Sequence, residues 1–392
     1  MAGNTTGQGG GGIYGKGYNA ITVSNSTLSG NSAVHSGGGI YGGEYSAITL
    51  TNSTLSGNSA AANGGGIYGH EYNTITVVSS TLTGNKALGN VNGDHTSGAG
   101  GGIYNFGADG TGATTTLINS IVAGNAAAVG HDLYSGYYTA GGSDGQSDLV
   151  FYGGNIIGSS PVNFATTGAP TATIDGASQS NLQAVFASVG NDPHTGVLSG
   201  TLADNGGPVE TVALNPDAGN PAIDSGDPSF LNETTAGIDL NGDGDTNDVI
   251  TTDARGFDRD VDFNADGTAA PDLGAFEQQL GQTFVVTTLA DENDAGATVA
   301  NPGETGLSLR EALVLANQDP TSPDTITFDP SLIGGNTPGH DGVLTLSQGE
   351  LSVAGNVIIE GDVNGDHVAD ITIDGNNASR IFDIDDGNDA TT

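Results

Sequence analysis

Apolar and polar residues alternate in short runs along the first third of the chain. Ile21 and Val23 alternate with polar neighbours, and Ile48 and Leu50 repeat the pattern further along. Alternation with a period of two, in runs bounded by glycine and asparagine, is typical of β-strands, whereas helices place apolar residues every three or four positions. The pattern therefore predicts an all-β structure built from many short strands.

These strands belong to a repeat. The string Gly-Gly-Gly-Ile-Tyr occurs at residues 10–14, 37–41, 64–68 and 100–104, so its spacings are 27, 27 and 36 residues. A repeat of this length is too short for two packed helices, but it matches one coil of a β-solenoid, in which equivalent residues stack about 4.8 Å apart. We therefore expect a right-handed parallel β-helix. The longer third interval contains Leu88–Ser97, which we expect to bulge out as a loop.

Equivalent positions in successive coils carry the same residue type, which predicts ladders of stacked side chains. Asparagines at a bend would bond amide to amide between coils, and the glycine before each asparagine allows the backbone angles that a tight bend needs. The predicted ladders are Ile21, Ile48 and Ile75; Leu28, Leu55 and Leu82; and Asn31, Asn58, Asn85 and Asn125.

One later segment departs from the strand pattern. Ser308 and Glu311 have the spacing of a helix capping box, and Leu309, Leu313 and Ala316 follow at helical spacing. We expect one short helix here. Such a helix would cover the open end of a solenoid, because uncapped strand edges invite aggregation.

Composition supports a thin, repetitive core. The 392 residues include 67 glycines, no cysteine, and only 35% hydrophobic residues, which suits coils that pack on one another better than a thick globular core. Forty-five acidic and six basic residues give a net charge of −39, so we expect neither nucleic acid nor an anionic membrane surface as a partner. No apolar stretch is long enough to cross a bilayer, so we expect no transmembrane segment, and an export signal would lie outside this chain.

The repeated strings resemble a family of surface proteins. Gly-Gly-Gly-Ile-Tyr, together with Ser-Thr-Leu-Ser-Gly-Asn at residues 26–31 and 53–58, resembles the coils of large bacterial β-helix proteins, including polymorphic outer-membrane-protein-like adhesins. The resemblance implies a parallel β-helix that is secreted or displayed at the bacterial cell surface.

Two later segments resemble modules of such proteins. Residues 202–277 resemble the choice-of-anchor Q module that usually ends them. Residues 284–384 resemble the CSLREA-type module that usually begins them, and Leu307 stands where that motif usually has cysteine. The matching strings are Leu202–Pro208, Asn220–Asp227, Thr251–Phe257 and Asp272–Glu277 for the first module, and Gly306–Ala312 for the second.

The order of the modules is informative, because an ending module precedes a beginning one. The resemblance therefore implies a junction between two solenoids. We expect β-helix coils over residues 1–160, an acidic, loop-rich module over residues 161–280, and a cap with the start of a further β-helix over residues 281–392.

Three acidic loops predict metal binding. Oxygen ligands at alternate positions, with a glycine or a short polar residue at the turn, suit the six to eight oxygens that calcium prefers. All three lack the glutamate of an EF-hand at position twelve, so we expect structural calcium in loops of another type, with ordinary Asx turns as the alternative. The candidate ligands are Asp239, Asn241, Asp243, Asp245 and Asp248; Asp262, Asn264, Asp266 and Asp272; and Asp362, Asn364, Asp366 and Asp370.

The resemblance and the acidic loops together favour a calcium-stabilised adhesin or structural stalk without catalytic activity. Its partner would be an extracellular glycan, a protein surface, or neighbouring repeats of the same protein. The isolated basic residues fit structural roles, and we expect Arg255 and Arg310 to bond to nearby carboxylates. The histidines fall at different coil positions and predict no metal site; they are His35, His70, His95 and His131.

Two alternatives remain. Many parallel β-helices are polysaccharide lyases or hydrolases, and Glu44 and Glu71 occupy the same place in adjacent coils, about 5 Å apart, which is near the spacing of a retaining glycosidase. The structural interpretation is a solvated ladder beside stacked tyrosines. The minor alternative is binding to ice or a crystalline surface, through an outward pattern that Thr22 and Ser24 begin and that Thr49 and Thr51 repeat.

Overall fold

The computed structural model describes every residue except 90–97, 109–111, 139–146, 218, 241–242, 304, 320–321, 334–341, 356, 366 and 385–392. The chain divides into two compact units: residues 1–204 with 208–278, and residues 205–207 with 279–392. The first unit holds both the expected coil segment and nearly all of the expected acidic module. Most of the expected loop at Leu88–Ser97 lies outside the described residues.

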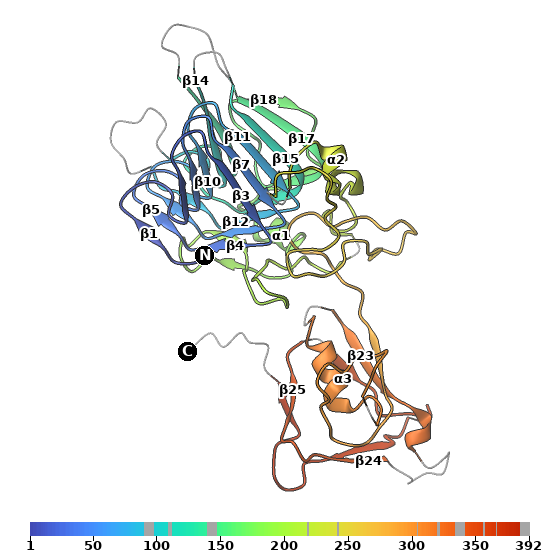
Figure 1. Cartoon of the computed structure of the whole chain (residues 1–392). Helices are drawn as coiled ribbons and strands as arrows, with labels where there is room; N and C mark the ends of the chain where they lie inside the picture. Colours follow the sequence, from blue (N-terminus) through green and yellow to red (C-terminus); the bar gives the residue numbers. More distant parts are fainter. Residues whose placement is uncertain are drawn as a thin grey trace. The chain divides into compact units, whose positions relative to one another are not determined.

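The first unit contains a parallel β-helix, which confirms the expected fold class (Figure 1). The coils contribute strands to three sheets, and all strand pairs in these sheets are parallel. The smallest sheet comprises β1 (Thr5–Thr6), β5 (Ser32–Ala33), β9 (Ser59–Ala60) and β13 (Lys86–Ala87). The second comprises β2 (Ile13–Gly15), β6 (Ile40–Gly42), β10 (Ile67–Gly69), β14 (Ile103–Ala108) and β16 (Leu133–Tyr138).

The third sheet is the largest and bends across two faces of the coil. On one face lie β3 (Ala20–Ser24), β7 (Ala47–Thr51) and β11 (Thr74–Val78), and on the other β4 (Thr27–Ser29), β8 (Thr54–Ser56) and β12 (Thr81–Thr83). The strands β15 (Thr114–Val122) and β17 (Ser147–Ile157) are long enough to join both faces, and β18 (Phe164–Thr167) and β19 (Ala172–Thr173) complete the sheet.

The apolar ladders form as expected. Ile48 pairs in register with the isoleucines of the coils before and after it, and Leu55 does the same with its leucines. Both side chains are fully buried in the core of the solenoid. In the next coil the isoleucine ladder ends, because Thr115 takes the equivalent place, whereas Val122 continues the leucine ladder.

The asparagine ladder also forms, and it is longer than expected. From Asn31 to Asn125, each Nδ2 donates to the Oδ1 of the next rung at 2.9 Å. Asn4 adds a rung before the first coil, and the carboxylate of Asp132 accepts from Asn125 at 2.9 Å and ends the ladder. The glycine before each predicted asparagine has a left-handed φ of 62–73°, which agrees with the expected bend.

The rest of the first unit packs against the coils. Ile121 and Ile156 of the solenoid share a buried core with Phe186, Leu273 and Phe276. This region has little regular structure and few strands. Its elements are α1 (Gln179–Gln183), β20 (Val189–Asn191), β21 (Leu198–Gly200), η1 (Pro228–Leu231) and α2 (Glu233–Ala236).

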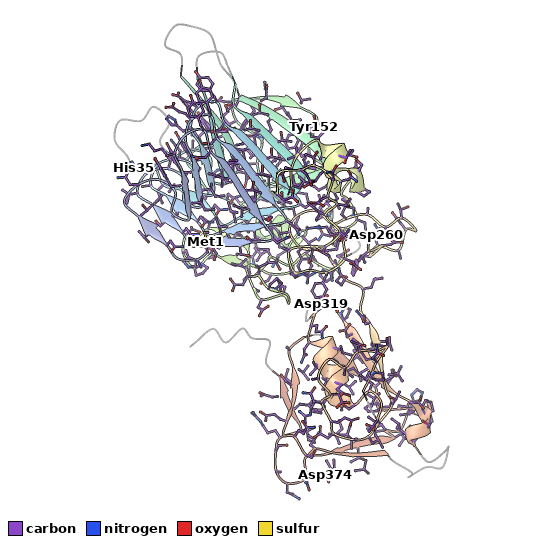
Figure 2. All side chains as sticks on the ribbon, viewed as in Figure 1. Met1, His35, Tyr152, Asp260, Asp319 and Asp374 are labelled. Carbon is purple, nitrogen blue, oxygen red and sulfur yellow. The ribbon has the colours of Figure 1, made fainter. Side chains whose placement is uncertain are left out.

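This packing covers the face on which the sequence predicts outward-facing threonines. Thr51 and Thr76 are only 2% and 6% exposed, so these two threonines do not belong to an open array of the kind that the minor alternative requires. On the same face, Val78 packs against Leu240, and Tyr152, labelled in Figure 2, stacks on a phenylalanine of η1 with 5.2 Å between ring centroids. Residues folding back from the acidic module shield the hydroxyls from solvent.

Within its described residues, the second unit combines parallel strand pairs with one α-helix. The predicted helix is present as α3 (Leu309–Ala316), and Ser308 and Glu311 make both bonds of the predicted capping box. Its apolar side lies in the core with the sheet residues Phe284 and Ile326. The strands are β22 (Thr283–Val286), β23 (Asp324–Phe328) and β26 (Val357–Ile359) in one sheet, and the pairs β24 (Gly342–Thr345) with β27 (Ile371–Asp374) and β25 (Leu351–Val353) with β28 (Phe382–Ile384); η2 spans Pro330–Leu332.

Candidate metal sites and a buried charge network

The first acidic loop gathers around a glutamate that the sequence did not single out. Glu233 opens α2 and is fully buried, and its carboxylate accepts from the backbone N–H of Leu240 at 2.7 Å and of Asp248 at 3.0 Å. Carboxylate oxygens of Glu233, Asp245 and Asp248 lie within 4.8 Å of one another. The loop therefore offers three oxygen ligands, two of which the sequence predicted.

Two other predicted ligands of this loop accept hydrogen bonds from its backbone N–H groups. Asp239 accepts from the N–H of Gly244 at 3.0 Å, and Asp243 accepts from the N–H of Asp245 at 3.0 Å. The second bond, two positions along the chain, is that of an Asx turn, and the first spans five positions within the loop. Asn241 lies outside the described residues.

The second acidic loop is closed by its own side chains. Asp262 accepts from the backbone N–H groups of Asp266 and Gly267 at 3.1 and 3.0 Å, and Asn264 accepts from Asp266 at 2.9 Å. Asp224 joins from outside the loop by accepting from the N–H of Asn264 at 2.7 Å. Burial raises the pKa of Asp224, backbone hydrogen bonds lower it in part, and the charges of Asp262 and Asp266 raise it further.

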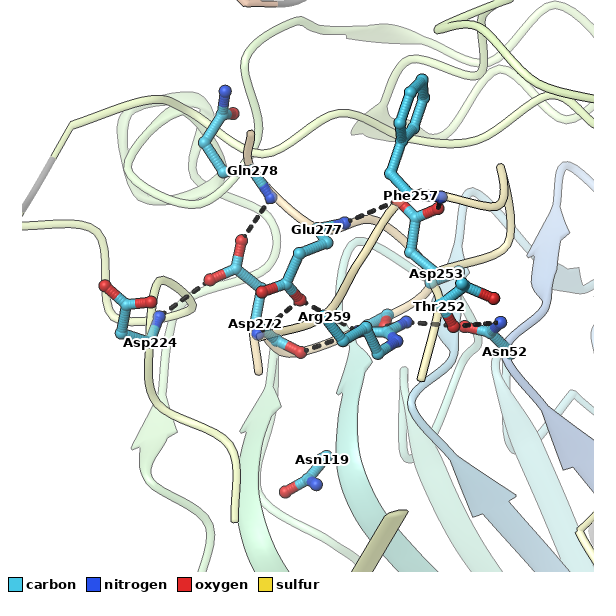
Figure 3. Close-up of polar contacts among 12 residues, drawn as sticks. Asn52, Asn119, Asp224, Thr252, Asp253, Phe257, Arg259, Asp272, Glu277 and Gln278 are labelled. Carbon is cyan, nitrogen blue, oxygen red and sulfur yellow. Dashed lines mark hydrogen bonds and ion pairs between the residues drawn. The ribbon is translucent and has the colours of Figure 1, made fainter. Parts of the chain in front are cut away.

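Asp272, predicted as the last ligand of the second loop, lies elsewhere. Its side chain is buried, with one oxygen accepting from the N–H of Asp224 at 2.8 Å and the other from the N–H of Gln278 at 2.6 Å (Figure 3). Both oxygens are thus occupied by backbone donors. The structure brings Asp272 into a buried network rather than into the Asp262 loop.

The third acidic loop belongs to the second unit. Asp362 accepts from the N–H groups of Gly365 and His367, each at 2.8 Å. Asp370 accepts from the backbone of Val363 at 2.9 Å and from the side chain of Asn364 at 3.1 Å. These bonds hold the loop to its own backbone and to Asn364, and Asp366 lies outside the described residues.

The strongest polar feature of the first unit is a buried network around two arginines. As predicted, Arg255 bonds a nearby carboxylate, with Nε 2.8 Å from Oδ2 of Asp253 and neither side chain exposed. Arg259, which the sequence did not mark, contacts Glu277 at 3.3 Å and donates to Oδ1 of Asn52 at 2.6 Å (Figure 3). Asn52 belongs to the turn after β7, so this bond ties the acidic module to the solenoid.

Burial controls the charge of this network. Three carboxylates face two guanidinium groups, and burial raises the pKa of Asp272 to about 7. Burial also raises the pKa of Glu277 well above its ordinary value, and the neighbouring charge of Asp272 raises it further, whereas Arg259 lowers it. The side chains of this network are buried and hydrogen-bonded to backbone groups, which suits a structural role. We call this network the clamp; it comprises Asp253, Arg255, Arg259, Asp272 and Glu277.

The prediction for Arg310 is also confirmed. Its Nε lies 2.7 Å from Oδ1 of Asp291, and its Nη1 and Nη2 donate to the carbonyl oxygens of Glu350 and Gly349 at 2.9 and 2.8 Å. This guanidinium therefore joins three segments of the second unit. Its bonds lower the pKa of Asp291, although burial acts in the opposite direction.

A further group lies on the outside of the coils. Ligand atoms of Glu44, His70 and Glu71 lie within 4.8 Å of one another. The sequence did not link His70 to the two glutamates; it directly precedes Glu71 and meets Glu44 of the preceding coil. His95 lies outside the described residues.

Comparisons with protein-family models, with curated proteins and with solved structures find no match. Within the described residues, no helix is long and apolar enough to cross a membrane. The coils, the acidic loops and the buried network around Arg255 and Arg259 are therefore the features from which a function can be proposed.

Proposed function

We propose that this chain is part of a non-catalytic adhesin or structural stalk that is secreted or displayed at a bacterial cell surface. The observation that carries the proposal is that the residues repeated every 27 positions are those that stack. The buried rungs of Ile48, Leu55 and Asn58 bond or pack with the coils on either side. The repeated part of the sequence thus serves the construction of a solenoid.

The clamp supports the same function. Arg259 and Asn52 join the acidic module to the coils, and the apolar contacts of Leu273 and Phe276 enlarge the shared core. A module held by buried contacts would move with the solenoid as one body. Such an arrangement suits a protein that transmits force or presents a surface.

We propose calcium as a structural component, at Glu233, Asp245 and Asp248. Three carboxylates within 4.8 Å of one another form an all-oxygen donor set of the kind that calcium prefers. A bound calcium would link the start of α2 to the loop that follows it, and it would offset part of the net charge of −39. We assign the second and third loops no bound ion, since among their described residues no three carboxylates lie within such reach of one another.

The proposed partner is an extracellular glycan or protein surface, or neighbouring repeats of the same protein. Binding of the intact chain to immobilised glycans and extracellular matrix proteins would test this proposal. We expect saturable binding to one class of surface, with the bound material recovered unchanged. Failure to bind any of these surfaces or a second copy of the chain would count against an adhesive role.

A carbohydrate-active enzyme is the second candidate. The observation that favours it is the proximity of Glu44, His70 and Glu71, which supplies two carboxylates and an imidazole at one place on the coils. If the chain is such an enzyme, it should release new reducing ends or unsaturated products from a polysaccharide, and Glu44→Gln should abolish them. If the chain is a non-catalytic stalk, neither product should form.

A further inference from the structure

Equivalent turns of two successive coils carry Glu44 and Glu71. Tyr45 and Tyr72 directly follow them with left-handed φ angles of 55° and 58°, and Glu71, unlike Glu44, is also left-handed with a φ of 43°. The N–H of Tyr45 donates to the carbonyl oxygen of Glu71 at 3.0 Å, which stacks the turns in register. The two carboxylates therefore leave the solenoid at the same place, one coil apart.

The imidazole beside them is held by aromatic rings. His70 stacks against Tyr41 and Phe106, with centroid distances of 6.4 and 6.1 Å and interplanar angles of 24° and 25°. Contacts on its faces leave the edge of the ring, with its nitrogens, facing other groups. One nitrogen lies within 4.8 Å of carboxylate oxygens of both Glu44 and Glu71.

The two carboxylates have no cationic partner in the described part of the chain. No lysine or arginine there forms an ion pair with Glu44 or Glu71. Their charges act on the neighbouring Tyr41, whose pKa is raised to about 12, first by burial, then by Tyr14, and then by the two glutamates. Like charges stacked in adjacent coils repel, so a bound cation at this place would stabilise the turns.

We infer that Glu44, His70 and Glu71 form a site for a divalent transition-metal ion such as zinc. One imidazole nitrogen and two carboxylate oxygens are ligands that zinc accepts, with water completing a tetrahedron. Zinc–ligand bonds of about 2.1 Å need ligand atoms about 3.4 Å apart. The three ligand atoms lie within 4.8 Å of one another, and Glu44 is exposed, so its carboxylate has room to approach a bound ion.

The site is specific to this pair of coils. In the first coil, Lys16 stands where His70 stands and Gly17 stands where the glutamates stand. The pairing of the first and second coils therefore offers one carboxylate, a lysine and no imidazole. The zinc site also differs from the group at Glu233, which offers oxygen alone and suits calcium. This inference adds a ligand that the stalk proposal does not require.

Isothermal titration of the intact, chelator-treated protein with zinc chloride tests the site. We expect a zinc-binding event whose affinity falls more than about tenfold in His70→Gln and in Glu71→Gln, because each removes a direct ligand. His35→Gln is the matched control, since His35 lies on the same coils outside the group, and it should leave zinc binding unchanged.

Calcium provides the opposite control. Asp245→Asn should reduce calcium binding and leave zinc binding intact, whereas His70→Gln should do the reverse. Circular dichroism of each variant before titration separates loss of the site from loss of the fold. Absence of zinc binding in the folded protein, an unchanged affinity in folded His70→Gln, or an equal loss in His35→Gln would overturn the inference.

Discussion

Replacing Arg259 with methionine tests the clamp between the acidic module and the coils. Methionine keeps most of the buried volume but removes the charge beside Glu277 and the donor to Asn52, which Arg259 reaches at 3.3 and 2.6 Å. Breaking a buried ion pair by removing one partner costs about 3–5 kcal/mol, because the remaining charge stays buried without compensation. We therefore expect Arg259→Met to lower the free energy of unfolding of the first unit by roughly 4 kcal/mol at pH 8.

The loss of unfolding free energy in Arg259→Met should be larger at pH 8 than at pH 5. The pKa of Glu277 is already raised by burial and by the charge of Asp272, and removal of Arg259 raises it further. A carboxyl with a raised folded-state pKa stabilises the fold below its unfolded pKa, and that contribution is lost as pH rises through the folded value. The variant should therefore recover part of its stability at pH 5, leaving a loss of roughly 2 kcal/mol from the missing hydrogen bonds.

Urea titration followed by hydrogen exchange and mass spectrometry measures the two units separately, because peptides report on each. Arg259→Met combined with Glu277→Gln is the control, and it should be more stable at pH 8 than Arg259→Met alone. A loss below about 1 kcal/mol at pH 8 would refute the reasoning, since it would lie within the range of an exposed pair. So would equal losses at pH 5 and pH 8.

Three further predictions follow from separate parts of the chain. Asn58→Ala removes donors and an acceptor from the buried ladder and should cost about 2–3 kcal/mol in urea titration of the first unit, whereas loss of the exposed Asn4 rung should cost much less. Calcium should raise the melting temperature of the wild type but not of Asp245→Asn, and an equal rise in both would contradict the site at Glu233. Ser308→Ala removes the N-cap of α3 and should cost about 1 kcal/mol; hydrogen exchange should show the change in the second unit alone.

The sequence predicted the parts of the fold that repeat. The 27-residue period determines which residues stack, so it predicts the partners of Ile48 and Asn58 in the neighbouring coils. The capping box around Ser308 was predictable because its two residues lie three positions apart. Each of these predictions depends on a spacing that recurs or on a contact that is local in the chain.

Contacts that occur once and join distant segments could not be predicted in this way. Arg259 bonds Asn52 across 207 positions, and no repeat marks either residue as the partner of the other. Val78 lies on the outward side of its strand, yet Leu240 of the acidic module packs against it. Asp132 ends the asparagine ladder although it follows Asn125 by only seven positions, which breaks the period of the coils.

The candidate sites show the same difference between local patterns, which the sequence predicts, and contacts between separate segments, which it does not. Asp245 and Asp248 lie three positions apart and were predicted as ligands of one acidic loop, but Glu233 joins them from the start of a helix that the sequence did not predict. The repeat places Glu44 and Glu71 at equivalent positions of adjacent coils. His70 was not linked to them, because its place in the turn is filled by other residue types in the neighbouring coils.

The stalk proposal is tested most directly by the chain length of acidic polysaccharides incubated with the intact protein, with calcium and zinc present. Size-exclusion chromatography with light scattering would measure that length before and after incubation, for the wild type and for Glu44→Gln. We predict that each polysaccharide keeps its full length with both proteins. Shortening by the wild type that Glu44→Gln abolishes would contradict the proposal and favour the enzyme.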